Sequence, residues 1–357
     1  MKRQALMSGT YPKFNKWEDE VVYYRFDKDR FDFNLAQSVL LAMEKISNNT
    51  CLRFSNEHSW NMLTVTSDKG CQSPIGRIWA KQYMSVGISC FDAGIVVHEL
   101  IHALGFVHSQ QRLDRDQYLN FNLTEWRLSD AFQMMQYAKY NSQLLLVPYD
   151  YGSVMQYYDD AKEYEPRDSR YIRTLGSHIV AFYDYLMINN HYGCFCQQTE
   201  IDCKNFGYPN PSNCEVCNCP YGFGGDDCSE RPEPGETIEA SKEWKNMTVS
   251  LDAGYSILSD GTKYSQRDYI YHFLWITAPA NKTIEIGVNG FTGVECGWGC
   301  TNGGIEVKTE KDPRLTSPRA CCVNETEVYR SSNNPTIVML YNLEGRDEYN
   351  LSYRYID

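Results

Sequence analysis

Residues 96–116 read VVHELIHALGFVHSQQRLDRD, the most informative stretch of this chain. It contains His98-Glu99-x-x-His102 within a helix that we predict to span Ala93 to Val107. The i, i+4 spacing places both imidazoles on one helical face, where their nitrogens can bind one metal ion at about 2.0 to 2.1 Å. Glu99, next to the first of them, can lean over an open position of that metal.

A third histidine, His108, follows His102 too far along the chain to share its helical face. Gly105 lies between them and tolerates the positive φ that a sharp turn requires. Three neutral imidazoles leave room for a water molecule, which is typical of a catalytic rather than a structural zinc site. We therefore predict one Zn²⁺ per chain on His98, His102 and His108, although cobalt or copper could occupy the same nitrogens.

The alternative is an ordinary core helix that carries histidines by accident. The five fixed positions of HExxHxxGxxH would arise by chance on the order of 10⁻⁵ times in a sequence of this length. A second motif also supports the metal site, because Ser153-Val-Met155-Gln-Tyr157 lies about 50 residues downstream, where it reads as the Met-turn of the metzincin signature. The two motifs favour a metal site over an accidental one.

Together these motifs resemble the astacin family of zinc endopeptidases. The resemblance extends from Lys16-Trp17 to the segment ending in Gly193-Cys194. Within the family, this sequence looks most like the nematode members. It implies an α+β metzincin catalytic domain with a twisted, mostly parallel sheet and an active-site helix. It also implies roles for individual residues: zinc ligands His98, His102 and His108, general base Glu99, a methionine floor at Met155, and a further, displaceable ligand at Tyr157.

One position departs from the family pattern. Astacins usually carry Glu directly after the third histidine, where it engages the mature N-terminus, whereas this chain has Ser109. All three ligands and Glu99 are intact, so we expect the chemistry to survive while the anchoring of the N-terminus stays open. A second open alternative is that the ring of Tyr157 only packs beside the metal.

Cysteine density divides the chain into three zones. The sparse first zone can build its own core, whereas the dense stretch from Cys196 to Cys228 is too small to fold without disulfides. That stretch ends in CNCPYGFGGDDC, which resembles an EGF-like module, and YIYHFLWITA at 269–278 resembles a CUB β-sandwich. We see neither the first disulfide common in CUB domains nor a set of calcium-binding carboxylates. The expected multidomain architecture is an astacin-like protease domain at 1–194, a small disulfide-rich EGF-like module at 195–229, a linker at 230–236 and an all-β CUB-like sandwich at 237–357.

The fourteen cysteines indicate an oxidising compartment. The resemblances imply the pairs Cys51–Cys194, Cys71–Cys90, Cys196–Cys214, Cys203–Cys217, Cys219–Cys228, Cys300–Cys321 and Cys296–Cys322.

The N-x-S/T glycosylation sequons are Asn48, Asn122, Asn246, Asn281, Asn324 and Asn350. Lys2-Arg3 before Gln4 is typical of a propeptide cleavage point, unless the two basic residues occur there by chance; we expect a secreted zymogen whose signal peptide and pro-segment lie outside this chain.

The composition narrows the class of partner. With 34 basic and 46 acidic side chains, the net charge is −12, which argues against nucleic-acid binding, and no apolar run is long enough to span a membrane. We predict a secreted zinc endopeptidase that hydrolyses extracellular proteins or peptides with a zinc-activated water and Glu99 as general base. The alternative is a catalytically silent matrix-binding or adhesion protein that uses the EGF-like and CUB-like modules.

Hydrophobic periodicity predicts the remaining elements of the first zone. Two further helices are expected at Leu35–Ile46, capped by Asn34, and at Ser177–Asn190. The expected strands are 51–54, 62–66, 75–78 and 82–86. We expect the other histidines (His58, His178, His191 and His272) at the surface or satisfied in the core.

Overall fold

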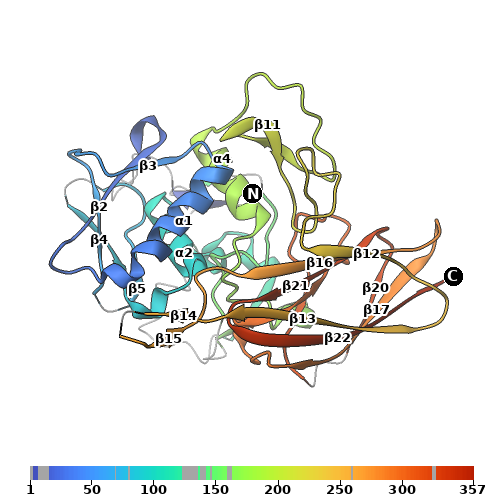
Figure 1. The fold of residues 1–357 in the computed structure, drawn as a ribbon. Coiled ribbons are helices and arrows are strands. Elements are labelled where there is room, and N and C mark those ends of the chain that lie inside the picture. Colours follow the sequence, from blue (N-terminus) through green and yellow to red (C-terminus); the bar gives the residue numbers. More distant parts are fainter. Residues whose placement is uncertain are drawn as a thin grey trace. The chain divides into compact units, whose positions relative to one another are not determined.

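The computed structural model describes residues 3–6, 16–68, 70–78, 81–122, 136, 142–144, 147–158, 163–258, 260–323 and 327–357. Lys2 and the sequon at Asn324 lie outside the described residues. The chain divides into two compact units (Figure 1). The first comprises Met1–Ser169, His178–Gln198 and Asn210–Asn213, and the second comprises Arg170–Ser177, Thr199–Pro209 and Cys214–Asp357.

The first unit is built on a five-stranded sheet. In spatial order its strands are β3 (Arg53–Ser55), β2 (Val21–Phe26), β4 (Leu63–Thr66), β6 (Gln82–Val86) and β5 (Cys71–Gln72). All neighbours pair in parallel except β5, which runs antiparallel to β6 along one edge. The predictions for β4 and β6 agree closely with the structure. The expected strand at 75–78 does not form, and β2 is a strand that the sequence reading did not assign.

Three helices accompany this sheet: α1 (Ala36–Asn49), α2 (Ala93–Ala103) and α4 (Phe182–Tyr192). The cap of the first was predicted wrongly, because Leu35 and not Asn34 is at its N-cap, with no side-chain capping hydrogen bond. Asp32 instead caps the short turn Phe33–Leu35 before α1, by accepting from Asn34 N at 2.9 Å. The predicted ends of α2 and α4 were also displaced. The helix α2 stops at Ala103 because the chain reverses at Gly105, and α4 starts only at Phe182.

Smaller elements complete the first unit. Two antiparallel pairs join β1 (Arg3–Leu6) with β8 (Ser142–Leu144) and β7 (Leu119–Phe121) with β9 (Tyr164–Pro166). Among the described residues, the 3-10 turns are Glu18–Glu20, Phe33–Leu35, Ile88–Cys90, Ser109–Gln111, Arg115–Gln117, Ser169–Tyr171 and Trp298–Cys300. The Cys51–Cys194 disulfide joins the residues that follow α1 and α4, and Cys71–Cys90 links β5 to the turn before α2.

The second unit is β-rich and contains two main sheets (Figure 1). The five-stranded sheet has the order β12 (Gly235–Glu239), β16 (Ile270–Thr277), β21 (Thr336–Asn342), β18 (Gly303–Val307), β19 (Arg319–Ala320). The four-stranded sheet has the order β13 (Lys245–Gly254), β22 (Gly345–Ile356), β17 (Thr283–Thr292), β20 (Glu327–Ser331). The hydroxyl of Tyr349 on β22 donates to Tyr341 O on β21 at 2.6 Å, so the two sheets meet in a shared core. Two further pairs are β14 (Ser256–Ile257) with β15 (Lys263–Tyr264) and β10 (Tyr208–Asn210) with β11 (Asn213–Asn218).

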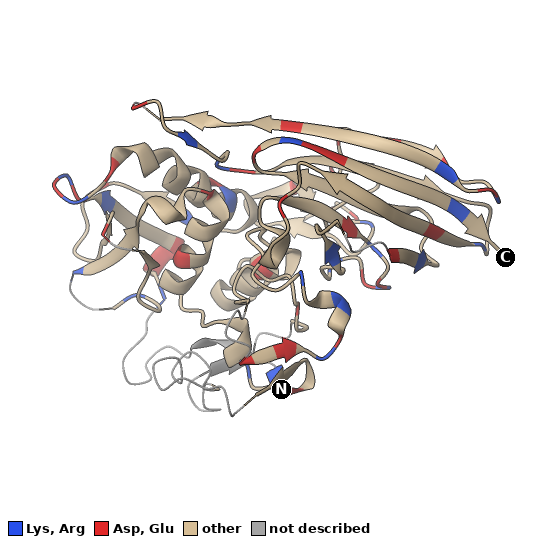
Figure 2. Ribbon diagram, turned by 90° about the horizontal axis from the view of Figure 1, so that it is seen from below, with Lys and Arg blue, Asp and Glu red and all other residues tan. Residues whose placement is uncertain are grey.

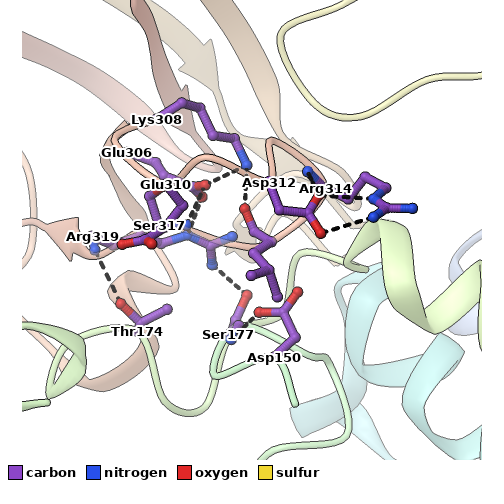
Figure 3. Close-up of polar contacts among 12 residues, drawn as sticks. Asp150, Thr174, Ser177, Glu306, Lys308, Glu310, Asp312, Arg314, Ser317 and Arg319 are labelled. Carbon is purple, nitrogen blue, oxygen red and sulfur yellow. Dashed lines mark hydrogen bonds and ion pairs between the residues drawn. The ribbon is translucent and has the colours of Figure 1, made fainter. Parts of the chain in front are cut away.

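A buried charged cluster stabilises this second unit (Figure 3). Glu306 accepts from Arg319 Nε at 3.0 Å and from Lys308 Nζ at 2.7 Å, and all three side chains are buried. The backbone N–H of Arg319 donates to Thr174 Oγ1 at 3.0 Å, and its guanidinium donates to Ser177 Oγ. Every charge of the cluster therefore has a partner, as buried charges require.

Disulfides and surface charge complete the description. The second unit contains Cys203–Cys217, Cys219–Cys228, Cys296–Cys322 and Cys300–Cys321; Cys196 and Cys214 are also disulfide-bonded, and no described cysteine is free. Acidic and basic residues are interspersed along the strands (Figure 2). No helix among the described residues is long and apolar enough to cross a membrane.

Candidate functional site

The helix α2 carries the first two histidines and is held at both ends. Asp92 caps its start, because Oδ1 accepts a hydrogen bond from Ile95 N at 3.0 Å. The other carboxylate oxygen of Asp92 lies 2.9 Å from Nδ1 of His178. Past the last helical turn the chain reverses at Gly105, whose φ of +108° disfavours any other residue. This turn carries the chain back toward the helix, where His108 meets the two helical histidines.

The three histidines converge through their Nε2 atoms. Nε2 of His108 lies 3.2 Å from Nε2 of His98 and 3.0 Å from Nε2 of His102. All three side chains are buried, and their ligand atoms lie within 4.8 Å of one another. Tetrahedral zinc with nitrogens at about 2.0 to 2.1 Å holds neighbouring ligands about 3.3 Å apart. The observed separations fit one zinc ion.

Hydrogen bonds on the far side of two rings orient them for a metal. Nδ1 of His98 donates to Val154 O and Nδ1 of His102 donates to Phe106 O, each at 2.7 Å. A carbonyl oxygen can only accept, so both Nδ1 atoms carry the proton and both Nε2 atoms keep a lone pair for the metal. Burial lowers the pKa of His98 to about 3 and that of His102 to about 4, which keeps both rings neutral.

Glu99 lies on the same helix, directly after the first histidine. Its side chain is buried, and its Oε2 atom has no hydrogen-bond partner within the part of the chain that the structure describes. Burial raises the pKa of this carboxyl to about 8. A buried carboxylate oxygen without a partner, beside three metal-binding nitrogens, is able to accept a proton from a ligand at that metal.

The segment from Ser153 to Tyr157 lies beneath and beside the histidines. Met155 is fully buried, and its carbonyl accepts the N–H of Ser109 at 2.8 Å. The ring of Tyr157 lies 4.0 Å from the ring of His108, centroid to centroid, and is 37% exposed. Burial and the nearby Glu99 raise the pKa of Tyr157 to about 12, so its hydroxyl stays protonated. The structure thus brings every residue expected at the metal site into one cluster.

Sequence reasoning missed Asp184, a residue of α4 that is only 2% exposed. Its Oδ1 accepts from Ser153 Oγ at 2.6 Å, and its Oδ2 accepts from Val154 N and Ala181 N at 2.9 Å each. Since Val154 O accepts the proton of His98, the carboxylate of Asp184 supports a zinc ligand through one residue, Val154. The signal for Asp184 was its place in the first turn of α4, where an acidic side chain can accept free backbone N–H groups. Because we expected the helix to start at 177, Asp184 was placed in the helix interior and this role was not recognised.

Ser109, at the position where the family usually has Glu, is also buried. Its hydroxyl donates to Ser153 Oγ at 3.3 Å, which links the segment after the third histidine to the Met-turn. Among the described residues only His98, His102 and His108 form a group of His, Cys, Asp or Glu that could hold a metal ion. Of the other histidines, His178 pairs with Asp92 and His191 is buried against Phe106, ring centroids 5.1 Å apart.

Comparisons with known proteins agree with this geometry. The family model for the astacin peptidases matches residues 9–193. The zinc metalloproteinase-like protein nas-21 of Caenorhabditis elegans is 52% identical over 100% of this chain and 89% of its own length. Zinc metalloproteinase nas-22 of the same organism is 51% identical over 90% of this chain and 89% of its own length. Among solved structures, high choriolytic enzyme 1, a hatching enzyme zinc-protease from the medaka fish Oryzias latipes, is 28% identical with a TM-score of 0.48 and covers 53% of this chain and 99% of that one.

The prediction of a zinc cofactor is confirmed by the family and by the three converging histidines. The match to the family model, the extensive identity to its members and the zinc-binding geometry lead to one conclusion. This chain belongs to the astacin family of peptidases and is a zinc metalloendopeptidase.

Proposed function

We propose that this metalloendopeptidase is secreted and hydrolyses peptide bonds of extracellular proteins, with Glu99 as its general base. The observation that supports the catalytic part is the buried Oε2 of Glu99, which lacks a partner in the described structure beside three converging imidazoles. Secretion is supported by the disulfide-bonded state of the cysteines, because such bonds persist in oxidising compartments. The exposed sequons at Asn48, Asn122, Asn246 and Asn281 are consistent with glycosylation there.

Each residue has a distinct task in this proposal. Bound zinc supplies a Lewis acid that makes water acidic near neutral pH and polarises a carbonyl group. His98, His102 and His108 hold the metal, and the carbonyls of Val154 and Phe106 keep two of the rings in the required tautomer. Glu99 takes a proton from the attacking water and delivers it to the departing amine.

Tyr157 is proposed to donate its hydroxyl hydrogen to the oxyanion that develops on the substrate. Its ring lies against His108, and its raised pKa keeps the hydroxyl a donor at neutral pH. By resemblance the same hydroxyl is a displaceable zinc ligand in the resting enzyme. The competing view, in which the ring only packs, is tested by Tyr157→Phe, because that change keeps the ring and removes only the hydroxyl.

The C-terminal zones are proposed to be an EGF-like module at 195–229, a linker at 230–236 and a CUB-like sandwich at 237–357. Two short disulfides, Cys203–Cys217 and Cys219–Cys228, support the first assignment. A two-sheet β unit with two closely spaced disulfides of its own supports the second. Such modules would direct contact with matrix or substrate.

The experiment that tests the proposal compares the full chain with its Glu99→Ala variant on a mixture of extracellular proteins. New protein N-termini, identified by mass spectrometry, should arise with the wild-type chain and not with the variant. Equal cleavage by both would refute Glu99 as the base. No cleavage by zinc-loaded wild-type chain, together with retained binding to matrix proteins, would favour the adhesion alternative.

A further inference from the structure

A small pocket lies on one face of the first unit's sheet, beside the loop between β3 and β4. The register aligns Arg25 of β2 with Thr64 of β4, and Thr64 with Tyr83 of β6, so these three side chains share one face. The next row, Val65 and Met84, points to the opposite face and is fully buried in the core. In the row with Arg25, the side chains of Arg25 and Tyr83 are exposed while Thr64 is buried between them, so the outer face of the sheet is on this side.

Side chains from this face and from the loop between β3 and β4 line an open hollow of about 260 Å³. Its walls include Arg25 and Thr64 from the sheet, His58 and Trp60 from the loop, and Lys81 from the start of β6. Trp60 is 97% exposed, although burying an indole normally stabilises a protein. Its indole therefore offers a flat apolar face beside the hollow, on which a ligand ring can stack.

The pocket is lined by positive charges, although the chain as a whole is acidic. The net charge of the protein is −12, yet the lining contains Arg25 and Lys81 and no carboxylate. Among the described residues neither cation has an acidic partner; Arg25 Nε donates only to Thr64 Oγ1, at 3.1 Å. A guanidinium carries five N–H donors, so most of them stay available to a ligand such as a sulfate or carboxylate group.

We propose that this pocket binds an anionic saccharide, one sugar unit that carries a sulfate or carboxylate group. The sugar ring stacks on the exposed face of Trp60, Arg25 and Lys81 bind the anionic group, and the Thr64 hydroxyl is placed beside it. An acidic protein partner fits less well, because a stable protein interface buries roughly 800 Å² on each side, whereas this site is one small hollow beside a single exposed indole. The proposal goes beyond the proteolytic function and does not rest on it.

The test measures binding of a fluorescein-labelled, fully sulfated heparin octasaccharide to the full chain by fluorescence anisotropy. The wild-type chain should bind the sulfated probe and not its desulfated counterpart, and raising the salt from about 50 to about 300 mM should weaken binding. Trp60→Ala should weaken binding about tenfold, the effect typical of losing an aromatic stacking platform. Trp60→Phe should recover part of that loss.

Charge variants supply the matched control. Lys81→Gln should weaken binding several-fold, whereas Lys28→Gln, which removes an exposed positive charge of the same unit outside the pocket, should leave it unchanged within twofold. All variants should hydrolyse a short peptide at the wild-type rate, because none of these residues lies at the zinc site. Wild-type affinity in Trp60→Ala, an equal loss in Lys28→Gln, or full competition by an acidic peptide would overturn the proposal.

Discussion

Replacing Asp184 tests whether a residue outside the zinc site determines how well that site binds metal. The carboxylate accepts hydrogen bonds from Ser153 Oγ, Val154 N and Ala181 N, and the carbonyl of Val154 in turn accepts the proton of His98. Asp184→Ala removes all three acceptor contacts in a place that water reaches poorly. We expect both a loss of stability and a loss of zinc affinity.

The magnitude follows from the three donors left without a partner. Each buried, unsatisfied donor costs about 1 to 3 kcal/mol, so Asp184→Ala should lower the free energy of unfolding by about 3 to 9 kcal/mol. Asp184→Asn should cost less, about 1 to 2 kcal/mol, because its amide oxygen can still accept from Val154 N and Ala181 N while its NH₂ donates to Ser153 Oγ. Loss of the support behind a zinc-binding histidine typically weakens metal binding about 10- to 100-fold.

Denaturant unfolding and competition with a zinc chelator measure the two effects separately. The matched control is Asn189→Ala on the same helix, which removes a partly buried hydrogen bond to Asn49 O at 2.9 Å, on the residues that end α1. The control should lose stability and keep its zinc affinity. If Asn189→Ala and Asp184→Ala lower zinc affinity equally, or if Asp184→Ala lowers stability alone, the link from Asp184 to His98 is refuted.

Four further predictions concern the site and the start of its helix. Glu99→Gln should keep its zinc while kcat falls about 10²- to 10⁴-fold; near wild-type turnover of a quenched peptide would exclude Glu99 as the base. Tyr157→Phe should raise the activation free energy by about 2 to 4 kcal/mol, so kcat falls while KM stays nearly unchanged. An unchanged kcat would mean that the ring of Tyr157 only packs. Metal analysis should find one zinc per wild-type chain and none in His102→Ala; undiminished zinc in the variant contradicts the ligand set. Although burial lowers the pKa of His178, the ion pair with Asp92 prevails and raises it, so the stabilisation is present below the unfolded pKa and is lost as the pH rises through the folded value. The stability difference between wild type and His178→Gln should therefore shrink on going to alkaline pH, and a difference independent of pH would rule out the charged pair.

The zinc ligands could be predicted from the sequence because their geometry is mostly local. Spacing i, i+4 on any α-helix places His98 and His102 on one face, and a glycine after the helix permits the return to His108. Element boundaries were less accurate, since they depend on which residue captures a free backbone N–H. A 3-10 turn capped by Asp32 precedes α1, so the N-cap of α1 falls on Leu35 and not on Asn34, and the helix α2 ends before Val107 because Gly105 takes a positive φ.

The sequence by itself determined the metal, its three histidines, the neighbouring carboxylate and the kinship with astacins, because these follow from residue identities at short, regular spacings. Only the tertiary structure revealed that Asp184 supports Val154 and thereby His98, and that Arg25, Trp60 and Lys81 line one pocket. These contacts join segments far apart in the chain, and their formation depends on how strands and helices pack against one another. Local propensity carries no information on that packing, because it reports only the preferences of neighbouring residues.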